Sequence, residues 1–491
     1  MQAAYAWRAS QNALDMLVKA FAEVFRPGDV RGLYPAQIDE DFAFIFGQAF
    51  VQHFGLSGRI ATGRDSRKSS EGLQQALNAG LQSACINVSD LGLCATELTY
   101  YASMQAEYDA SIMVTGSHNP INSNGFKCVL SDGRAVSFEN GLAEVLGIMQ
   151  RLKSRYSKSR DASSGSQTGS LQNVSLIPQY TAFLSDLFSL DPSKFNGIAV
   201  NGLNGSASTL VSPLAACFDL PVSWFRKEPG PMPELGADPS RKALSDEMSG
   251  YMTGHKYDFG VAWDSDCDRC VFYDGEGQML PSSYAVAIFA EYFLEAHPGE
   301  TIVYDTKLVF NTEAVLKRLS GKPAPALTGS AFMHQQMKAT NAIYGGESSA
   351  HHYFRMFSGC DSGMIAWLSM LQLLQRRGVS LRQLVEEHQG LARCAAEISL
   401  SIENVDSAFS CIDGRYGPRA ERVDEFDGLA FWMPGSWRFS LRQSKTEDKV
   451  RLNFETKGRP EDLLEEGEQV LKLLRPFCRL TDAEKPVLLV Q

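Results

Sequence analysis

Short apolar runs alternate with helical patterns along most of this chain, and this alternation constrains the fold more than any other feature. The runs at 58–62, 197–200 and 301–304 have the length and composition of buried strands. Helical patterns lie between such runs, as at 70–84 and 284–294. Strands separated by helices usually form parallel sheets covered by those helices. The sequence therefore predicts α/β domains with largely parallel sheets.

The chain is too long for one hydrophobic core. Its 491 residues correspond to about three or four domains of roughly 100–200 residues each. Beyond residue 395, shorter strand-like pieces surround one late helix at 460–474, which indicates an α+β piece. We expect an N-terminal helix and first domain at 1–153, a Ser-rich linker at 154–175, and further domains at 176–281, 282–394 and 395–491.

Composition excludes several classes of protein. The formal net charge is −11 with no basic stripe, which argues against a nucleic-acid partner. No apolar run reaches the length of a membrane span, and the first residues do not form a signal peptide. The ten cysteines include no CxxC pair, as is typical of reduced thiols. We therefore expect a cytoplasmic protein without a membrane partner. Apolar residues at helical spacing also predict an amphipathic helix at 13–25, whose expected role is packing.

A serine in a turn is the first candidate for chemistry. Residues 115–120 read Thr-Gly-Ser-His-Asn-Pro and follow the apolar run 111–114. Serine is a weak nucleophile unless a base activates it or it carries a group to transfer. His118 follows Ser117 directly, and Lys127 lies ten residues further on. A plain turn has the same composition, so the segment alone leaves both interpretations open.

Three alternating carboxylates follow the apolar run that ends at Trp263. Asp264, Asp266 and Asp268 can converge on one hard cation, and Mg²⁺ suits oxygen ligands while keeping positions open for a phosphate. Arg269 can offset the repulsion between them. An acidic surface turn is the alternative; an EF-hand is disfavoured because its glycine and distal glutamate are missing.

Two more segments have the chemistry of polyol and phosphate binding. Residues 344–353 place Glu347 and Ser349 behind a Gly-Gly pair, where they can hydrogen-bond ring hydroxyls. Residues 442–447 combine an arginine with two hydroxyls in a short loop, which can cradle a phosphate. A solvated hairpin loop is the alternative for the second segment.

Together with two Arg- and Asp-rich turns at 25–32 and 63–70, these segments resemble the α-D-phosphohexomutase family from about residue 24 to residue 476. The family pattern runs FRxxDxRG, GRDxRxSS, TxSHNP, DxDxDR, GExSxH and RxSxTE, and all six motifs occur here in that order. The resemblance implies four domains around a central cleft. Three would be α/β domains with mixed sheets, and the fourth a smaller C-terminal α+β domain.

The resemblance also implies a mechanism. Ser117 would carry a phosphoryl group and pass it to a hexose phosphate, giving a hexose 1,6-bisphosphate that reorients and returns its other phosphoryl group. Mg²⁺ would bind Asp264, Asp266 and Asp268 together with Ser117, and Arg269 would support this loop. His118, Lys127 and Arg31 would serve in proton transfer and charge clamping. Substrate-binding residues carried over in the same way are Glu347, Ser349, His351, His334, Arg442, Ser444, Lys445, Thr446 and Arg451.

Within the family, the similarity is greatest to the bacterial phosphomannomutases of surface-polysaccharide synthesis, through residues 346–355, 360–365 and 437–439. It implies a phosphomannomutase acting on small hexose phosphates, with a hexose 1,6-bisphosphate as activator, as a monomer or dimer. The chain departs from the family at His334, where a lysine is usual, and at Ser330, Lys445 and Asp448.

Three alternatives stay open. The chain could be a phosphoglucomutase or dual-specificity phosphohexomutase, because glucose and mannose differ only at C2. The departures would also suit a weakly active paralogue that binds sugar phosphates. A metal-dependent glycosyltransferase is disfavoured because neither a P-loop nor a Rossmann glycine motif is present.

Overall fold

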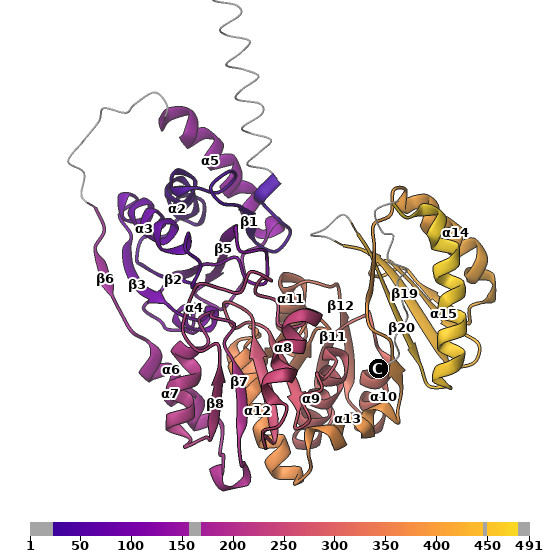
Figure 1. Cartoon of the computed structure of the whole chain (residues 1–491). Helices are drawn as coiled ribbons and strands as arrows, with labels where there is room; N and C mark the ends of the chain where they lie inside the picture. Colours follow the sequence, from indigo (N-terminus) through magenta and orange to yellow (C-terminus); the bar gives the residue numbers. More distant parts are fainter. Residues whose placement is uncertain (1–22, 157–167, 445–448, 480–491) are drawn as a thin grey trace, which may run out of the picture. The chain divides into compact units, whose positions relative to one another are not determined.

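The computed structural model describes residues 23–156, 168–444 and 449–479. The chain divides into two compact units. The first unit runs to Gln278 and also takes in Phe357–Arg376; the second unit comprises Met279–Met356 and the chain from Arg377 onward. Among the described residues, each unit contains two of the four sheets, whose strands are labelled in part in Figure 1.

The first sheet of the first unit has the strand order β1-β5-β4-β2-β3-β6. β2, β3, β4 and β6 are mutually parallel, whereas β5 runs antiparallel to β4 and to β1. The strands are β1 (Val30–Leu33), β2 (Arg59–Arg64), β3 (Asn87–Leu93), β4 (Ala110–Val114), β5 (Ser123–Leu130) and β6 (Leu171–Asn173). The helices of this part are α2 (Glu40–Phe54), α3 (Ser70–Ser83), α4 (Thr96–Ser103) and α5 (Leu142–Tyr156).

Local chemistry explains where α2 begins and ends. The Asp39 side chain accepts a hydrogen bond from the N–H of Phe42 (2.8 Å) and caps the helix N-terminus. Gly55 ends the helix with φ of +62°, a conformation that glycine adopts without strain. The buried face of α2 stacks aromatic rings on the sheet, with the rings of Phe46 and Phe126 4.8 Å apart.

The second sheet has the order β10-β9-β7-β8, with β10 antiparallel to β9 and the other pairs parallel. Its strands are β7 (Ile198–Asn201), β8 (Val222–Phe225), β9 (Phe259–Trp263) and β10 (Cys270–Asp274). Its helices are α6 (Ile177–Leu187), α7 (Ser208–Cys217) and α8 (Lys242–Met252). Most of α12 (Gly363–Arg377) also belongs to the first unit, where the Trp367 and Trp263 rings meet edge to face at 5.6 Å.

The third sheet, in the second unit, has the order β12-β11-β13-β14 and is parallel except for β14. Its strands are β11 (Thr301–Asp305), β12 (Lys322–Ala326), β13 (Tyr344–Gly346) and β14 (His352–Phe354). The helices are α9 (Ser282–Ala296), α10 (Phe310–Arg318), α11 (Ser330–Thr340) and α13 (Leu381–Gln389).

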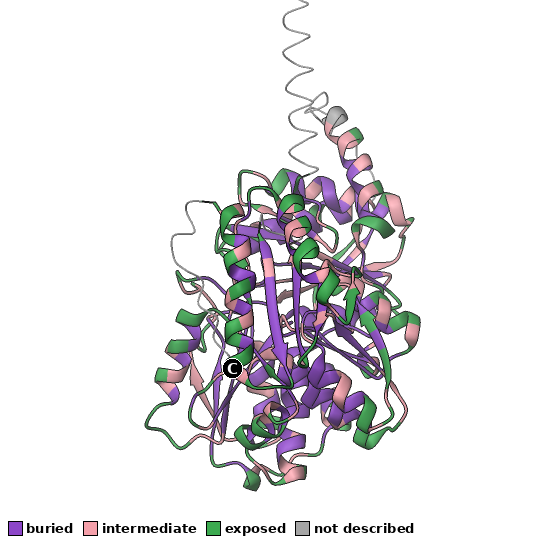
Figure 2. Ribbon diagram, turned by 90° about the vertical axis from the view of Figure 1, so that its right-hand side faces the viewer, coloured by how far each residue is buried: buried purple, intermediate pink, exposed green. Residues whose placement is uncertain are grey.

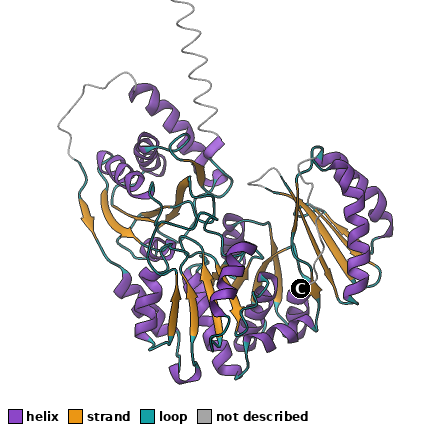
Figure 3. Cartoon of the chain, viewed as in Figure 1, coloured by secondary structure: helices purple, strands orange, loops and turns teal. Residues whose placement is uncertain are grey.

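The fourth sheet is antiparallel and has the order β15-β20-β19-β18-β17, with β16 also paired to β20. Its strands are β15 (Arg393–Cys394), β16 (Ile398–Leu400), β17 (Arg422–Asp424), β18 (Leu429–Met433), β19 (Trp437–Gln443) and β20 (Val450–Thr456). α14 (Val405–Tyr416) and α15 (Pro460–Leu474) pack on it around a core that includes Phe439 and Phe454. Many strand residues are buried (Figure 2). In the parts of the chain that form the first three sheets, helices and strands largely alternate along the sequence (Figure 3).

These sheets confirm the predicted fold class of α/β domains with mixed sheets and a smaller C-terminal α+β piece. Within the predicted linker at 154–175, the structure shows the strand β6, which pairs with β3, whereas residues 157–167 lie outside the described residues. β6 is an exposed strand at the edge of its sheet, so its polar composition resembles that of a loop. The predicted helix at 13–25 lies almost entirely outside the described residues. Among the described residues, no helix is both long and apolar enough to cross a membrane.

Candidate active site

The loop between β4 and β5 holds Ser117 in a constrained conformation. Ser117 is buried and has φ of +48°, in the left-handed region that non-glycine residues seldom adopt. The Ser117 N–H donates to the Thr115 hydroxyl (2.8 Å). The preceding residue is Gly116, because a Cβ at that position would lie 2.3 Å from the Arg67 guanidinium. Strain of this kind persists only where the surroundings fix it, and it clusters at functional sites.

Arg67 supplies much of that support. Its guanidinium donates to the carbonyl oxygens of residues 117, 119, 120 and 123 at 2.5–3.0 Å. Its Nε donates to Asp65 (3.1 Å), and Asp65 also accepts from the hydroxyl of Thr115 (2.9 Å) and the N–H of Gly116 (3.1 Å). The turn at 63–70 therefore supports the loop between β4 and β5 that carries Ser117, the serine loop.

The loop at 264–269, which we call the metal loop, lies between β9 and β10 and contacts the serine loop directly. The Ser117 hydroxyl donates to Asp264 (2.9 Å), and the Ser265 hydroxyl donates to the carbonyl oxygen of Ser117 (2.9 Å). One oxygen from each of Asp264, Asp266 and Asp268 lies within 4.8 Å of the others, and all three are buried. The structure thus brings the predicted nucleophile and the predicted metal ligands together.

The donor set fits a divalent cation. Burial and the charges of Asp268 and Asp266 raise the pKa of Asp264 well above its usual value, so the cluster disfavours accumulating negative charge. Asp266 Oδ1 is buried and accepts no hydrogen bond from the described residues. Carboxylate oxygens are the ligands that Mg²⁺ prefers in proteins. These residues can therefore hold a metal.

Lys127, from β5, and Thr96, at the start of α4, contact the same carboxylates. The Lys127 ammonium donates to Asp266 (2.7 Å) and to Asp268, and the Thr96 hydroxyl donates to Asp266 (2.7 Å). Burial lowers the pKa of Lys127, but Asp266 and Asp268 outweigh it and the net shift is upward. Lys127 is therefore held as a cation. Thr96 gave no recognisable signal in the sequence.

The other residues predicted for this part also lie at the serine. His118 places Nδ1 3.3 Å from the Ser117 hydroxyl and Nε2 3.3 Å from the Arg269 guanidinium. The Arg269 N–H donates to Asp264 (3.2 Å). Arg31 donates to the carbonyl oxygen of Thr115 and to Asp29. The pKa of Arg31 is lowered by burial but raised on balance by Asp29 and by the aspartates of the metal loop.

In the second unit, the predicted sugar-binding loop follows β13. Glu347 is buried and accepts from the N–H of Gly329 (3.0 Å) and from the Tyr353 hydroxyl (3.4 Å). His351 lies 3.7 Å from Glu347 and 3.0 Å from the Ser349 hydroxyl. His334 is buried on α11, the helix that begins just after Gly329. These four predicted residues therefore belong to one region of the unit.

Lys307 and Asp305 are candidates that the sequence analysis missed. Asp305 ends β11, next to β13, and its carboxylate accepts from the N–H (2.9 Å) and the hydroxyl (2.6 Å) of Ser348. Lys307 is also buried, with its ammonium 3.7 Å from Asp305. The sequence could have indicated both residues, because they follow the apolar run 301–304. Charged residues at the end of a parallel strand lie at the carboxyl edge of the sheet, where ligands bind.

Three of the predicted phosphate-binding residues, Arg442, Ser444 and Arg451, lie on the β19–β20 hairpin. Arg442 is near the end of β19, and the Ser444 N–H donates to the carbonyl oxygen of Lys449 (2.8 Å), which closes the hairpin. Arg451, directly opposite Arg442, contacts Glu397 (3.1 Å) and the Ser399 hydroxyl (2.7 Å). Lys445 and Thr446 fall outside the described residues.

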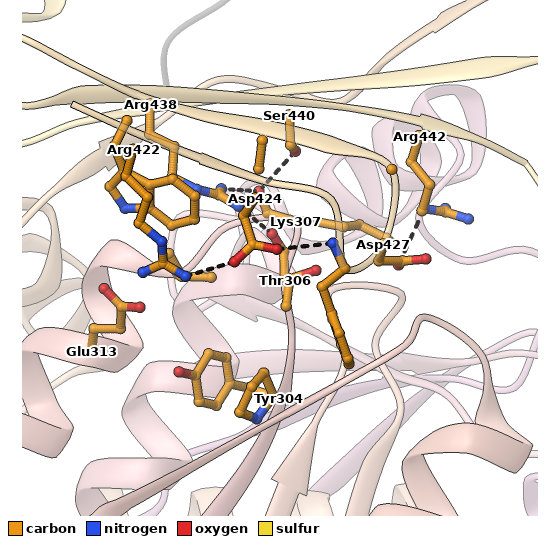
Figure 4. A pocket seen from close by; sticks show the side chains of 16 residues that line it. Tyr304, Thr306, Lys307, Glu313, Arg422, Asp424, Asp427, Arg438, Ser440 and Arg442 are labelled. Carbon is orange, nitrogen blue, oxygen red and sulfur yellow. Dashed lines mark hydrogen bonds and ion pairs between the residues drawn. The ribbon is translucent and has the colours of Figure 1, made fainter. Parts of the chain in front are cut away.

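A cavity of about 320 Å³ opens beside this hairpin within the second unit. Figure 4 shows Lys307, Asp427 and Arg442 among its lining side chains, together with Arg438 and Ser440. Arg438 is fully buried and bridges the two sheets of the unit, donating to the carbonyl oxygen of Lys307 (2.7 Å) and to Glu455 (2.9 Å). The cavity thus joins the end of β11 to the strand that carries Arg442.

Comparison with known proteins agrees with this geometry. Residues 22–155 match the model of phosphoglucomutase/phosphomannomutase α/β/α domain I, and residues 281–390 match that of domain III. A phosphomannomutase of Salmonella montevideo is 35% identical over 458 residues, which cover 92% of this chain and 98% of that protein. These matches confirm the family resemblance inferred from the motifs.

Solved structures show the same fold. A phosphoglucomutase/phosphomannomutase family protein from Burkholderia thailandensis superposes with a TM-score of 0.79 at 25% identity, covering 93% of this chain and 98% of that one. An Aspergillus fumigatus N-acetylphosphoglucosamine mutase, solved with GlcNAc-6P and magnesium, has a TM-score of 0.57 at 12% identity, covering 95% and 99%. The second likeness concerns the fold alone.

Proposed function

Because this chain belongs to the phosphoglucomutase/phosphomannomutase family, we propose that it is a phosphomannomutase that interconverts mannose 6-phosphate and mannose 1-phosphate. The observation that carries the proposal is the contact between the strained, buried Ser117 and the three-aspartate loop. The coverage of the Salmonella phosphomannomutase over almost its whole length supports mannose phosphates as the substrates.

The reaction consists of two phosphoryl transfers, first from the serine to the sugar and then from the sugar to the serine. The bond between the Ser117 oxygen and phosphorus breaks as a bond forms between phosphorus and the free hydroxyl of the hexose monophosphate, and the proton of that hydroxyl passes to the serine oxygen. The resulting hexose 1,6-bisphosphate reorients, and its other phosphoryl group returns to the serine oxygen. The serine is thus a carrier, so it needs no triad to make it a nucleophile in the resting enzyme.

The surrounding residues stabilise charge during transfer. Asp264, Asp266 and Asp268 would hold Mg²⁺, which supplies electrostatic stabilisation of the phosphoryl oxygens. Lys127 and Arg31 remain positive in this site and suit charge clamping. His118, next to the Ser117 hydroxyl, is our candidate for moving the proton between the serine and the sugar hydroxyl.

The second unit would bind the substrate away from the reacting atoms. Glu347, Ser349, His351 and His334 would contact ring hydroxyls. Arg442, Ser444, Lys445, Thr446 and Arg451 would hold the phosphate that does not react. Because these contacts bind a phosphate and ring hydroxyls at fixed positions, the bisphosphate can bind in either orientation. Lys307, buried beside Asp305, adds a cation for the same phosphate or hydroxyls. A cytoplasmic location fits the ten free cysteines.

A phosphoglucomutase or dual-specificity enzyme is the second candidate, favoured by the joint name of the matching family models. Relative kcat/KM for mannose 1-phosphate and glucose 1-phosphate, with Mg²⁺ and a trace of hexose 1,6-bisphosphate, separates the two. We expect a preference for mannose. Equal values would indicate dual specificity, and absence of turnover with both sugars would refute the proposal.

A further inference from the structure

Asp427 lies in a tight turn between β17 and β18 that is fixed against β19. Gly428 has φ of +92°, and a Cβ there would lie 2.2 Å from the carbonyl oxygen of Leu441, so only glycine fits. The Asp424 carboxylate accepts from the Phe426 N–H (2.9 Å), which stabilises the same turn. The Asp427 side chain is therefore held beside the strand that carries Arg442.

One oxygen of Asp427 contacts two segments that are distant in sequence. Asp427 Oδ2 accepts from the hydroxyl (2.6 Å) and the N–H (3.1 Å) of Thr328. The same oxygen lies 3.7 Å from Arg442 Nε (Figure 4). The side chains of Asp427 and Arg442 are only 5% and 12% exposed. Water therefore screens the attraction between these two charges less than it screens an exposed ion pair.

Thr328 leads directly to the sugar-binding loop. The next residue, Gly329, donates its N–H to Glu347 (3.0 Å) and begins the helix that carries His334. Contacts therefore run without interruption from Arg442 through Asp427 and the 328–329 segment to Glu347. All of these residues belong to the second unit.

We propose that Asp427 is a positioning residue that couples the phosphate grip of Arg442 to the sugar-binding Glu347. The Asp427 carboxylate attracts the guanidinium from its Nε side at 3.7 Å, and Nη1 donates to the carbonyl oxygen of Gln443 (3.4 Å). These two contacts fix the plane of the guanidinium, whose remaining terminal N–H groups suit the oxygens of the substrate phosphate. This inference rests on the proposed function, because Arg442 and Glu347 are assigned there to the two ends of one hexose phosphate.

The direction of the effect follows from this role. The phosphate held by Arg442 does not react, so its contact has the same strength in the ground state and in the transition state. Loss of the Asp427 charge should therefore raise KM and leave kcat nearly unchanged. A residue that only maintained the fold would instead lower the melting temperature and the fraction of active enzyme.

The test uses Asp427→Asn, which removes the charge but keeps the shape, and Thr328→Val, which removes only the hydroxyl. Glu425→Gln is the matched control, because Glu425 is exposed in the same turn. We expect Asp427→Asn to raise KM for mannose 1-phosphate about tenfold, with kcat within about twofold and an unchanged melting temperature. Thr328→Val should raise KM by a smaller factor when Asp427 is present, and should add little in the double variant.

Two results would overturn the coupling. One is a KM for Asp427→Asn equal to that of Glu425→Gln; the other is full additivity of the two single variants. Calorimetric binding of mannose 1-phosphate gives the same comparison without turnover, with a similar rise in Kd expected for Asp427→Asn. Absence of turnover by the unaltered enzyme would count against the proposed function only, since the Kd comparison still decides the coupling.

Discussion

At the scale of single residues, Ser117 depends on the groups that hold it in place. Arg67 is fully buried and bonds four loop carbonyl oxygens, so it fixes the left-handed conformation of the serine. Arg67→Met would leave these acceptors and the Asp65 charge without their main partner. We expect a loss of about 3 kcal/mol in the free energy of unfolding and a fall in kcat of about a hundredfold or more.

Denaturant unfolding and steady-state kinetics measure these two effects. Arg64→Met is the control, because Arg64 is only loosely paired with the exposed Glu71, at 3.7 Å. It should change stability by less than about 1 kcal/mol. Equal effects of the two substitutions would refute the role assigned to Arg67.

A second prediction at this scale concerns the metal. If Asp264, Asp266 and Asp268 bind Mg²⁺, then saturating Mg²⁺ should raise the melting temperature, and a chelator should reverse the rise. At about 100 times Kd the stabilisation is about 2.7 kcal/mol. Asp266→Asn should abolish the response, whereas Asp132→Asn, on an exposed turn, should keep it. An unchanged response in Asp266→Asn would contradict the assignment.

At the scale of secondary-structure elements, Glu97 connects three helices within the first unit. It lies on α4, accepts from the Tyr180 hydroxyl on α6, and accepts from the Met364 N–H (2.9 Å) at the start of α12. The preceding Thr96 bonds Asp266, and a Cβ at Gly363 would lie 2.5 Å from the carbonyl oxygen of Cys267. Glu97 therefore fixes the helix that packs on the metal loop.

Glu97 also makes stability depend on pH. Burial raises its pKa from 4.5 to about 8. The folded state therefore binds more protons than the unfolded state between these values, and stability falls as pH rises through this window. Relative to Glu97→Gln, the unaltered protein should lose up to roughly 4 kcal/mol between pH 5 and pH 9. Urea unfolding at both pH values measures the difference, and a constant difference would contradict the shifted pKa.

Sequence patterns predicted elements well where one face is apolar. α15 was expected at 460–474 and lies there, and the expected run at 111–114 is β4 with one more residue. The edge strand β6 was missed because exposed strands carry no apolar alternation. In the site, motif residues such as Ser117 and Asp264 could be predicted, because their chemistry demands particular side chains at fixed spacing.

The residues that connect motifs could not be predicted in this way. Asp427, Thr96 and Glu97 act through contacts between segments that are distant in sequence, and no local pattern marks such contacts. The placement of α12 could not be predicted either. The chain before Phe357 and after Arg376 belongs to the second unit, whereas most of α12 belongs to the first.

At the scale of the whole molecule, the two units divide the proposed work. The groups assigned to phosphoryl transfer, including Ser117 and the three aspartates, belong to the first unit, and those assigned to substrate binding belong to the second. Substitutions in the first unit's site should therefore lower kcat, whereas those at Arg442 or Asp427 should mainly raise KM. A kcat effect of Arg442→Ala as large as that of Asp266→Asn would contradict this division.

The proposed mechanism depends above all on Ser117 as the carrier of the transferred phosphoryl group. The decisive measurement is the intact mass of the purified protein before and after turnover of mannose 1-phosphate whose phosphate oxygens carry a heavy isotope, run beside Ser117→Ala. We predict that the protein carries one phosphoryl group on Ser117, that labelled substrate exchanges it for a labelled group, and that Ser117→Ala lacks both the group and turnover. Turnover by Ser117→Ala at the rate of the unaltered enzyme, or a phosphoryl group that labelled substrate does not exchange, would contradict this mechanism.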